Sequence, residues 1–394
     1  MRYPELILKR ERERSLQKGH PWLFSGAIAR MNGNPQPGDV VTAVTHSGEP
    51  VGLGFFNPAT DISFRLLTTR VSETIDDRFW EDRIRSSFNL RQRIVPPGTT
   101  AYRLINAEGD GMPGLIVDRY DRCLVVSIAT AGMEKCRSAI VGGLIRILSP
   151  RTIYERSEGK ARQLEGLSER KEWIYGEDPP GFIEIMENGL IFAVDVVSGQ
   201  KTGFFLDQRK NRECIEKVSE GARVFNCFSY SGAFSVYAIR GGAEQVTSVD
   251  ISAPACDMAR ENLSRNGFSP DRHPVVQADV FSYLRETEES FDVIILDPPA
   301  FAKSKKDVSR SARGYKDINL HAVRRLSPGG LLATFSCSNY IGEELFEKIV
   351  TGAVLDAGKE ARLIERLGPG GDHTVHLAHP EGRYLKGLLL GISG

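Results

Sequence analysis

The sequence predicts an α/β protein whose largest part contains a doubly wound parallel sheet. Residues 181–394 alternate apolar strand segments with helical segments, which is the pattern of such a sheet. Residues 71–180 combine a long charged helical segment with strand segments, and residues 1–70 consist of short strand segments separated by Gly and Pro. The chain has 394 residues, enough for two or three domains. We therefore expect a β-rich domain over 1–70, a small α+β domain over 71–180 and an α/β domain over 181–394.

The composition indicates a soluble protein of the cytoplasm. Hydrophobic residues make up 41% and charged residues 26% of the chain, values typical of a globular protein with packed cores. No apolar run approaches the ~20 residues that span a bilayer, and the N-terminus lacks the apolar stretch of a signal peptide. The six cysteines are scattered without a CxxC pair. This argues against a disulfide framework and a structural zinc site, and favours a reducing compartment.

The charges balance over the whole chain but not locally. Lys and Arg total 51, as do Asp and Glu, so the chain is not a generic polyanion binder. Local basic patches can still steer nucleic acid. The first thirty residues hold seven basic residues against three acidic ones, with Arg10 and Arg12 among the basic residues and Trp22 close by. We expect this segment to contact RNA.

Short elements are expected in the first two segments. After a turn at 33–39, strands are predicted over 39–45, 51–57 and 62–68, which suggests a small barrel. In the second segment a helix is predicted over 76–93, a tight turn at 109–114, a hairpin over 115–129, a helix near 134–148 and a strand at 152–155. Residues 177–180 are interpreted as a linker, and an exposed edge of this central domain could support a homodimer.

The third segment carries the clearest alternation. Strands are predicted over 222–227, 245–250, 273–277, 291–296 and 330–336, with helices over 233–240 and 255–266. In an open α/β sheet, ligands bind beyond the carboxyl ends of the strands near the reversal of strand order. The first of these strands ends in NCFSYSGA, so Gly232 would let the backbone approach a ligand closely. Asp250 ends the second strand and could accept hydrogen bonds from both ribose hydroxyls of an adenosine, while Asp279 and Phe281 could flank the adenine.

Two other interpretations of this strand end compete with an S-adenosylmethionine (SAM) site. A lone glycine after a strand is often only a turn, but polar or glycine features at three successive strand ends are harder to obtain by chance. A nicotinamide dehydrogenase would need G-x-G-x-x-G, and NCFSYSGAF has a single glycine. The zwitterionic amino-acid tail of SAM fits better than a pyrophosphate. Lys201 and Arg209 could close over the cofactor or form plain salt bridges.

A cysteine and a carboxylate are expected to form a catalytic pair. Asp297 follows one apolar strand and Cys337 ends the next, so both converge on one pocket if the two strands are neighbours. A thiolate that attacks C6 of cytosine activates C5 towards a methyl sulfonium. Asp297 could bind the N3/N4 edge of the base and assist proton transfer. The competing interpretation of Cys337 is a small buried hydrophobic residue at a strand end; Cys227 and Cys256 are interpreted as structural.

The chain resembles the bacterial large-subunit (23S) rRNA cytosine-C5 methyltransferases that carry an N-terminal PUA domain. The resemblance covers essentially the whole chain. The matching residues are 19–22, 24–27, 110–114, 201–203 with 206–209, 226–230, 313–319, 335–338, 380–382 and 384–387. It implies a PUA domain, a small central domain, a Rossmann-like class I methyltransferase domain, and Cys337 as the nucleophile. One departure is that residues 298–301, PPAF, lack the second loop cysteine of many RNA cytosine-C5 methyltransferases, so how the covalent adduct is resolved stays open.

Other functions compete with cytosine-C5 methylation. A related family that methylates guanine N7 shares the FSY and DPPxF elements but has no cysteine in the SCS element (residues 336–338 here), and Cys337 argues against it. Methylation at another base position and a non-catalytic RNA-binding assembly factor are the remaining alternatives.

RNA contacts are expected mainly in the basic segment after the Asp-Pro-Pro loop, where Phe301 or Tyr315 could stack on an unpaired base. For a single cation there, a solvated surface is the simpler interpretation. The candidate RNA-binding residues are Lys303, Lys305, Lys306, Arg313, Lys316, Arg10, Arg12 and Trp22. The candidate cofactor-binding residues are Asn226, Phe228, Ser229, Tyr230, Gly232, Asp250, Asp279, Phe281, Asp297, Lys201 and Arg209.

Overall fold

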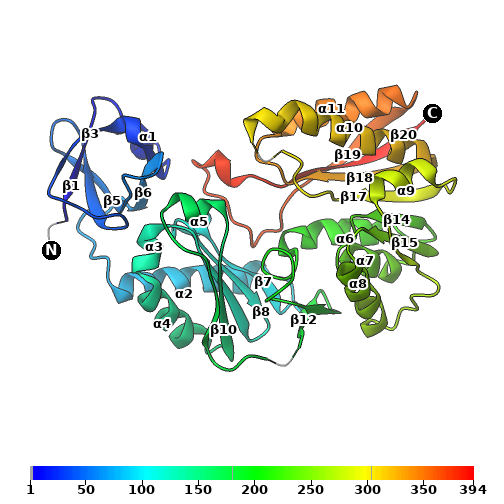
Figure 1. The fold of residues 1–394 in the computed structure, drawn as a ribbon, viewed down its shortest axis with the longest axis horizontal. Helices are drawn as coiled ribbons and strands as arrows, with labels where there is room; N and C mark the ends of the chain where they lie inside the picture. Colours follow the sequence, from blue (N-terminus) through cyan, green and yellow to red (C-terminus); the bar gives the residue numbers. More distant parts are fainter. Residues whose placement is uncertain (1–2, 180, 303) are drawn as a thin grey trace. The chain divides into compact units, whose positions relative to one another are not determined.

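The computed structural model describes residues 3–179, 181–302 and 304–394, and the chain forms two compact units (Figure 1). The first unit contains the described residues up to Ile185 together with Val194–Phe204 and Gly371–Gly382. The second contains Met186–Ala193, Phe205–Gly370 and Arg383–Gly394. Three segments of the predicted third domain, 181–185, 194–204 and 371–382, therefore belong to the first unit. Among the described residues, no helix is long and apolar enough to cross a membrane.

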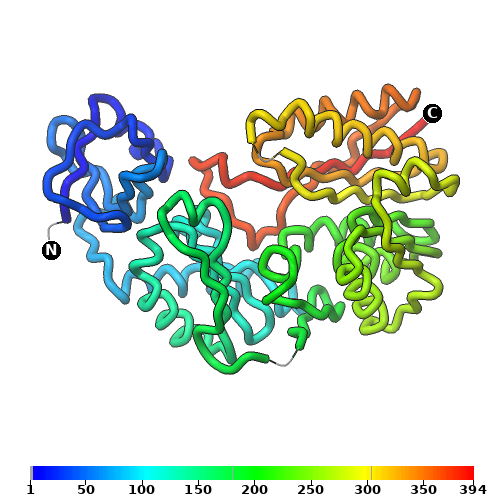
Figure 2. The backbone as a smooth tube through the Cα atoms, in the orientation of Figure 1, coloured from blue at the N-terminus to red at the C-terminus, as the bar shows by residue number. Residues whose placement is uncertain are grey.

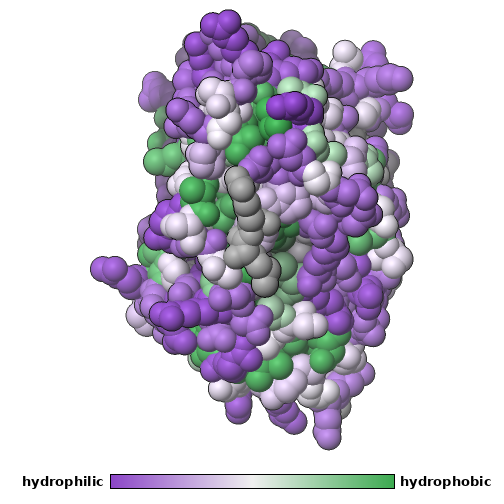
Figure 3. All heavy atoms as spheres, turned by 90° about the vertical axis from the view of Figure 1, so that its left-hand side faces the viewer, coloured by the Kyte–Doolittle hydropathy of each residue, from purple (hydrophilic) through white to green (hydrophobic). Residues whose placement is uncertain are grey.

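The first part of the chain forms a six-stranded sheet in the order β2-β6-β5-β4-β1-β3. Its strands bury Leu6, Val41, Phe56 and Phe64 in a common core. The face that these strands present in Figure 3 is mostly hydrophilic, with small scattered apolar groups. The elements are β1 (Glu5–Leu8), α1 (Arg14–Gln17), β2 (Trp22–Phe24), η1 (Ser25–Ala27), β3 (Ile28–Asn32), β4 (Val40–Val44), β5 (Pro50–Phe56) and β6 (Ile62–Thr68).

The central part forms a five-stranded sheet in the order β11-β10-β9-β8-β7, and helices α2 and α4 contribute to one hydrophobic core with it. Both β11 and β7 are edge strands, and a dimer through such an edge stays a prediction. The elements are α2 (Asp77–Ile94), β7 (Ala101–Asn106), η2 (Ala107–Asp110), β8 (Leu115–Tyr120), β9 (Cys123–Ile128), α3 (Ala131–Lys135), α4 (Arg137–Leu148), β10 (Thr152–Ser157), α5 (Lys160–Leu164) and β11 (Arg170–Tyr175).

Two details of this part differ from the sequence prediction. The helix expected near 134–148 is broken at Cys136 into α3 and α4. In α3, Gly132 packs so closely that an added Cβ would lie 2.0 Å from the Phe55 ring. The expected linker at 177–180 is followed by an unpredicted hairpin of β12 (Ile183–Glu187) and β13 (Leu190–Val194), although Pro180 itself lies outside the described residues. Asn188 and Gly189 form its turn with φ of +51° and +79°, which is the Asn-Gly pattern of a tight hairpin.

The second unit is built on a seven-stranded sheet in the order β16-β15-β14-β17-β18-β20-β19. The elements are η3 (Leu206–Gln208), α6 (Arg209–Lys217), β14 (Arg223–Cys227), α7 (Ala233–Arg240), β15 (Gln245–Asp250), α8 (Ala253–Arg265), β16 (Val275–Gln277), α9 (Val280–Glu286), β17 (Phe291–Leu296), η4 (Lys305–Asp307), α10 (Val308–Arg325), β18 (Leu326–Ser336), α11 (Glu343–Asp356), β19 (Glu360–Leu367), η5 (Pro380–Gly382) and β20 (Lys386–Ser393). Of these, η5 lies in the first unit.

Alternating residues of the central strands pack on opposite faces of this sheet, as the two-residue period of a strand requires. Val224, Val293 and Ile295 join a core with α6 and α7. Phe225, Ile294 and Leu296 join a second core with α9, α10 and α11. Burial on both faces explains why the sequence shows continuous apolar runs here rather than alternation.

The expectation of a parallel sheet is correct for the pairing of five strands, and the two pairs formed by β20 are the exception. Strands β16, β15, β14, β17 and β18 are parallel neighbours. Strand β20 is antiparallel to both β18 and β19, between which it lies. The reason is the chain path, because the segment after β19 makes a long excursion and re-enters the sheet as β20 (Figure 2). No local signal in the sequence encodes this insertion.

A buried ion pair anchors the excursion in the first unit. Arg91 of α2 is fully buried, and its two terminal nitrogens lie 2.5 and 2.8 Å from the carboxylate oxygens of Asp110. Arg91 also donates to the carbonyl oxygen of Asp372 at 2.7 Å and to the Thr374 hydroxyl at 3.2 Å. A second anchor lies at Thr202, whose hydroxyl donates to Asp118 at 2.6 Å. These contacts explain why Val194–Phe204 and Gly371–Gly382 belong to the first unit.

We predict that Arg91→Met destabilises the first unit by about 3–5 kcal/mol, because it leaves the Asp110 carboxylate buried without its partner. Arg93→Met is the matched control, since Arg93 lies on the same helix but is exposed. Urea unfolding followed by fluorescence measures the difference. Equal midpoints for the two variants would contradict the anchoring role of Arg91.

Candidate active site at the carboxyl ends of the parallel strands

The loop after β14 is conformationally strained. Phe228 and Tyr230 adopt φ of +58° and +44°, in the left-handed region that non-glycine residues rarely occupy. Gly232 follows with φ of +73° and is the N-cap residue of α7. Such strain persists only where the surroundings hold it, and it concentrates at functional sites. The loop lies where the strand order reverses, because the chain continues from β14 to β15 on one side and later adds β17 on the other side.

Asp250 holds this loop from the neighbouring strand end. One carboxylate oxygen accepts a hydrogen bond from the Tyr230 backbone N–H at 2.9 Å, and the other accepts from the Ser252 N–H at 2.9 Å. Each oxygen keeps a further lone pair for a ligand. The backbone N–H of Ser229 donates to Val249 at 3.0 Å, so the loop is fixed to β15 at two points.

Two buried polar atoms of the loop suit a polar ligand. The Asn226 amide donates to the Ser235 hydroxyl at 2.9 Å, but its side-chain oxygen has no hydrogen-bond partner among the described residues. The Ser229 hydroxyl is likewise buried without a partner there. Buried polar groups are almost always satisfied, so each such atom calls for an explanation. The amino-acid tail of SAM, which carries both donors and acceptors, would satisfy them.

Asp279, which follows β16, has a structural role as a helix cap. Its carboxylate accepts hydrogen bonds from the Ser282 N–H at 2.9 Å and the Ser282 hydroxyl at 3.0 Å, and so caps α9. Phe281 is half-buried, and its ring lies 6.2 Å from Phe228 and 5.9 Å from Phe301. The expected contacts of Asp279 and Phe281 with adenine stay predictions.

Strands β17 and β18 are neighbours, which is the condition for Asp297 and Cys337 to converge on one pocket. Leu296 pairs with Thr334 in the parallel ladder, so Asp297 and Cys337 follow adjacent strand ends. Both side chains are half-buried rather than sealed. Tyr315 of α10 is within electrostatic range of both, because each of these groups contributes to raising the pKa of Tyr315 to about 12, although burial is the largest cause.

The segment around Cys337 is held on both sides. The Ser336 hydroxyl donates to the Tyr315 hydroxyl at 3.0 Å, and the Ser338 hydroxyl donates to the carbonyl oxygen of Ala302 at 3.0 Å. The second bond ties the SCS element to the loop that follows Asp297. Tyr315 is fully buried, so the expectation that it stacks on a base is wrong: its ring packs 4.6 Å from Phe301, which is itself half-buried.

The other five cysteines are poorly suited to act as nucleophiles, because burial raises the pKa of each thiol. The pKa rises well above its ordinary value at Cys227, which is fully buried, and it is also raised at Cys256. It is about 11 at Cys123, Cys136 and Cys214. A thiol with a raised pKa is protonated at neutral pH and is a weak nucleophile. This agrees with a structural role for Cys227 and Cys256.

Lys201 and Arg209 lie in different units. Lys201 belongs to the first unit and has φ of +50°. The adjacent Thr202 donates a hydrogen bond to Asp118 in the same unit. Arg209 begins α6 in the second unit and is buried. Their expected contacts with the cofactor stay predictions.

The expected RNA-binding cations differ in their surroundings. Lys305, Lys306 and Arg313 are exposed on η4 and α10. Lys316 is half-buried and forms an ion pair with Asp356 at 2.7 Å, so it resembles a structural residue. Lys303 lies outside the described residues.

In the first unit, Arg10 and Arg12 are exposed, whereas Trp22 is half-buried. Its indole N–H donates to Glu108 at 2.9 Å, and its ring lies 4.3 Å from that of His379. Trp22 therefore packs within its own unit, and its contact with RNA stays a prediction.

Sequence reasoning missed Lys386, a buried lysine on β20. Its position in the match over 384–387 was noted, but no role was assigned to it. The available signal was a lone lysine next to the apolar run GLLLGI, because a lysine inside a buried strand is unusual.

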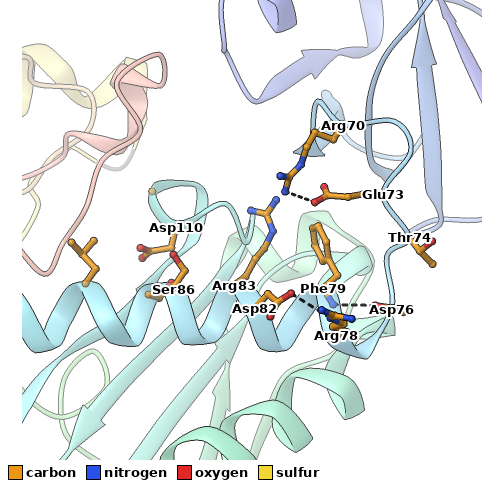
Figure 4. A pocket seen from close by; sticks show the side chains of 13 residues that line it. Arg70, Glu73, Thr74, Asp76, Arg78, Phe79, Asp82, Arg83, Ser86 and Asp110 are labelled. Carbon is orange, nitrogen blue, oxygen red and sulfur yellow. Dashed lines mark hydrogen bonds and ion pairs between the residues drawn. The ribbon is translucent and has the colours of Figure 1, made fainter.

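An open cavity of about 720 Å³ elsewhere in the molecule does not resemble a ligand site (Figure 4). It lies beside α2 in the first unit, whereas the candidate residues after β14, β15, β17 and β18 belong to the second. Arg70 pairs with Glu73, Arg78 with Asp82, and Arg83 packs on the Phe79 ring. Because its charged groups satisfy one another, we assign it no ligand.

We predict that Gly232→Ala weakens SAM binding and destabilises the second unit by about 2–4 kcal/mol, the sum of left-handed strain and overpacking. An added Cβ would lie 2.9 Å from that of Ala259. Gly221→Ala is the matched control, since Gly221 has φ of +66° but open space around it. Urea unfolding and calorimetry with SAM measure both effects. Equal results for the two variants would contradict close packing at Gly232.

Comparison with known proteins identifies two domain families. The S-adenosylmethionine-dependent methyltransferase family matches residues 162–367, more than half of the chain, and a PUA-like domain matches residues 6–69. A solved structure from Streptococcus mutans assigned to the SAM-dependent methyltransferases covers 98% of this chain and 99% of its own, with a TM-score of 0.83 and 24% identity. Another, a methyltransferase complex with SAH, has a TM-score of 0.85 at 24% identity and covers 98% of this chain and 99% of its own. The expected Rossmann-like fold with an N-terminal PUA-like domain is confirmed.

Relatives with higher identity extend over nearly the whole chain. The ribosomal RNA large subunit methyltransferase I of Photobacterium profundum is 45% identical over 97% of this chain and 98% of its own length. Its counterpart from Aeromonas hydrophila is also 45% identical, over 98% of each chain. Identity at this level over full length shows common descent. The chain therefore belongs to the ribosomal RNA large subunit methyltransferase I family of SAM-dependent methyltransferases, and its cofactor is SAM.

Proposed function

We propose that this protein methylates C5 of a cytosine in large-subunit ribosomal RNA, with Cys337 as covalent nucleophile. The RNA class is supported by the names of the full-length relatives and by the PUA-like domain. The base and position are supported by one observation above the others: a half-buried cysteine lies at the strand end next to that of Asp297. Methylation of guanine N7 has no use for a cysteine there.

The chemistry explains why a thiol is needed. Cytosine C5 is a poor nucleophile, but addition of the Cys337 thiolate to C6 forms a C–S bond and shifts the electron pair of the double bond to C5. When bound, SAM supplies the electrophilic methyl group that C5 accepts. A base then removes the C5 proton, the freed electron pair restores the double bond, and the C–S bond breaks to return the thiolate.

Asp297 contacts the same cytosine from the adjacent strand end. Its carboxylate accepts from the N4 amino group and takes part in proton transfer at the N3/N4 edge. Pro298 is buried after it, and two consecutive prolines restrict the loop and remove two backbone donors. In SAM binding, Asn226 and Ser229 contact the amino-acid tail, Asp250 the ribose, and the Phe228–Phe281 region the adenine.

We assign three functional domains on this basis: residues 1–70 as the PUA-like RNA-binding domain, 71–180 as the central α+β domain and 181–394 as the methyltransferase domain. Arg10 and Arg12 provide cations for RNA in the first. Lys305, Lys306 and Arg313 provide them in the third, on elements that follow the Asp297 loop. Positive charge beside a catalytic loop neutralises RNA phosphates and orients the target base.

We predict that Cys337→Ala abolishes methylation while SAM binding, measured by calorimetry, is retained, because the thiol acts on RNA rather than on the cofactor. Cys214→Ala is the control, since Cys214 is also half-buried and packs on the same hydrophobic core. Full activity of Cys337→Ala would remove the covalent mechanism.

The base itself is tested by mass spectrometry of nucleosides from ribosomal RNA of a deletion strain and of the complemented strain. Loss of one 5-methylcytidine on deletion, restored by the wild-type gene but not by Cys337→Ala, is expected. Loss of a methylated guanosine instead would establish another base, and an unchanged nucleoside profile would favour an assembly role without catalysis.

We predict that Arg313→Ala weakens RNA binding and lowers the slope of log affinity against log salt by about 1, as expected for the loss of one phosphate contact. Lys316→Met is the comparison, because Lys316 already pairs with Asp356 and should change the slope little. Fluorescence anisotropy with an RNA fragment at several salt concentrations measures the slopes. An unchanged slope for Arg313→Ala would exclude this residue from the RNA surface.

A further inference from the structure

A buried lysine lies beside the nucleophile segment. Lys386 begins β20 and is only 8% exposed. In the antiparallel ladder it pairs with Ser336, the residue before Cys337. Its ammonium donates to the carbonyl oxygen of Ser338, the residue after Cys337, at 2.6 Å. Lys386 therefore contacts the SCS element on both sides of the cysteine.

The ammonium is held by neutral groups. Its second hydrogen bond goes to the carbonyl oxygen of Ile341 at 2.5 Å. The hydrogen bonds of the Lys386 ammonium thus go to carbonyl oxygens, and no carboxylate among the described residues forms an ion pair with it. A buried cation without a paired anion is costly, and proteins keep such groups mainly where the charge has a use.

Besides Cys337, four described titratable groups lie in this part of the second unit. Asp297 follows β17, Tyr315 lies on α10, Glu343 begins α11, and Lys386 begins β20. Burial lowers the pKa of Lys386, whereas Cys337 and Glu343 raise it, so thiol and ammonium lie within electrostatic range of each other. Tyr315 is neutral because its pKa is about 12. Among these described groups Lys386 alone is a basic side chain, whereas Asp297 and Glu343 are carboxyl groups.

We propose that Lys386 is a positioning residue for the nucleophile: its ammonium fixes the turn after Cys337 through two carbonyl oxygens, and its charge favours the thiolate form of Cys337. The inference rests on the proposed function, because it gives Lys386 a role only if Cys337 attacks the base. A lysine of merely structural use would stabilise the fold and leave the titration of the thiol unchanged.

The pH dependence of Cys337 alkylation by iodoacetamide in the full-length protein, followed by peptide mass spectrometry, tests the proposal. In Lys386→Met the midpoint should move about one pH unit upward, which is about tenfold less alkylation at pH 7. The acid limb of the methylation rate should move with it, so that activity recovers at high pH. Lys386→Arg keeps the charge and should titrate near the wild type, and Lys348→Met is an exposed control.

An unchanged midpoint in folded Lys386→Met would overturn the proposal. The wild type provides a test that does not depend on any variant folding: a Cys337 midpoint at or above the ordinary thiol value of ~8.5 would also overturn it. Failure of the proposed function is distinguishable, because it would appear as full methylation by Cys337→Ala. If that variant is inactive while Lys386→Met leaves the alkylation midpoint unchanged, the inference about Lys386 alone fails.

Discussion

Parallel pairing of β14 with β15 on one side and β17 on the other is the constraint on which the candidate site depends. Cys227 pairs with Val249 in one ladder and with Leu296 in the other. The residues after these positions, Phe228, Asp250 and Asp297, must therefore emerge at one edge of the sheet. Since β17 also pairs with β18, the same constraint brings the segment of Cys337 to that edge. The other interactions at the site adjust side chains whose backbone positions are already aligned by this strand register.

The loop after β14 shows how local strain is maintained. Left-handed φ at Phe228 and Tyr230 is unfavourable for residues with a Cβ, so it needs a compensating interaction. The carboxylate of Asp250 provides one by accepting the Tyr230 N–H. The loop then leaves the Asn226 side-chain oxygen and the Ser229 hydroxyl buried without a hydrogen-bond partner among the described residues. A loop held in this way is prepared for a ligand before the ligand binds, which lowers the entropy lost on binding.

The antiparallel strand β20 brings its first residue, Lys386, to this edge of the sheet, where a parallel strand would end. It enters the sheet beside β18, so its first residue meets the last residues of β18. In that position the ammonium of Lys386 reaches the carbonyl oxygens that follow Cys337. Tyr315 and Ala302 hold the same element through its two serines. The segment of Cys337 is thus held by groups from β20, α10 and the loop after β17, while the side chain of Cys337 is half-buried.

The sequence by itself determined the elements with strong local signals. Most observed bounds of β14, α7, β15 and β17 agree with the predicted ones to within one residue, because apolar runs bounded by Gly and polar residues encode them locally. It also identified Asp250, Asp297 and Cys337 as residues at strand ends. The hairpin of β12 and β13 was missed, although its Asn-Gly turn was readable.

Only the tertiary structure decided which distant residues meet. The place of β20 between β18 and β19, the return of Gly371–Gly382 to Arg91, the burial of Tyr315 and the pairing of Lys316 with Asp356 all arise from contacts between residues far apart in the chain. Propensity and periodicity report on neighbours within a few residues, so they carry no information on such pairs. Lys386 is the clearest case: its residue type was legible in the sequence, but its position beside a cysteine 49 residues earlier was decided by strand pairing.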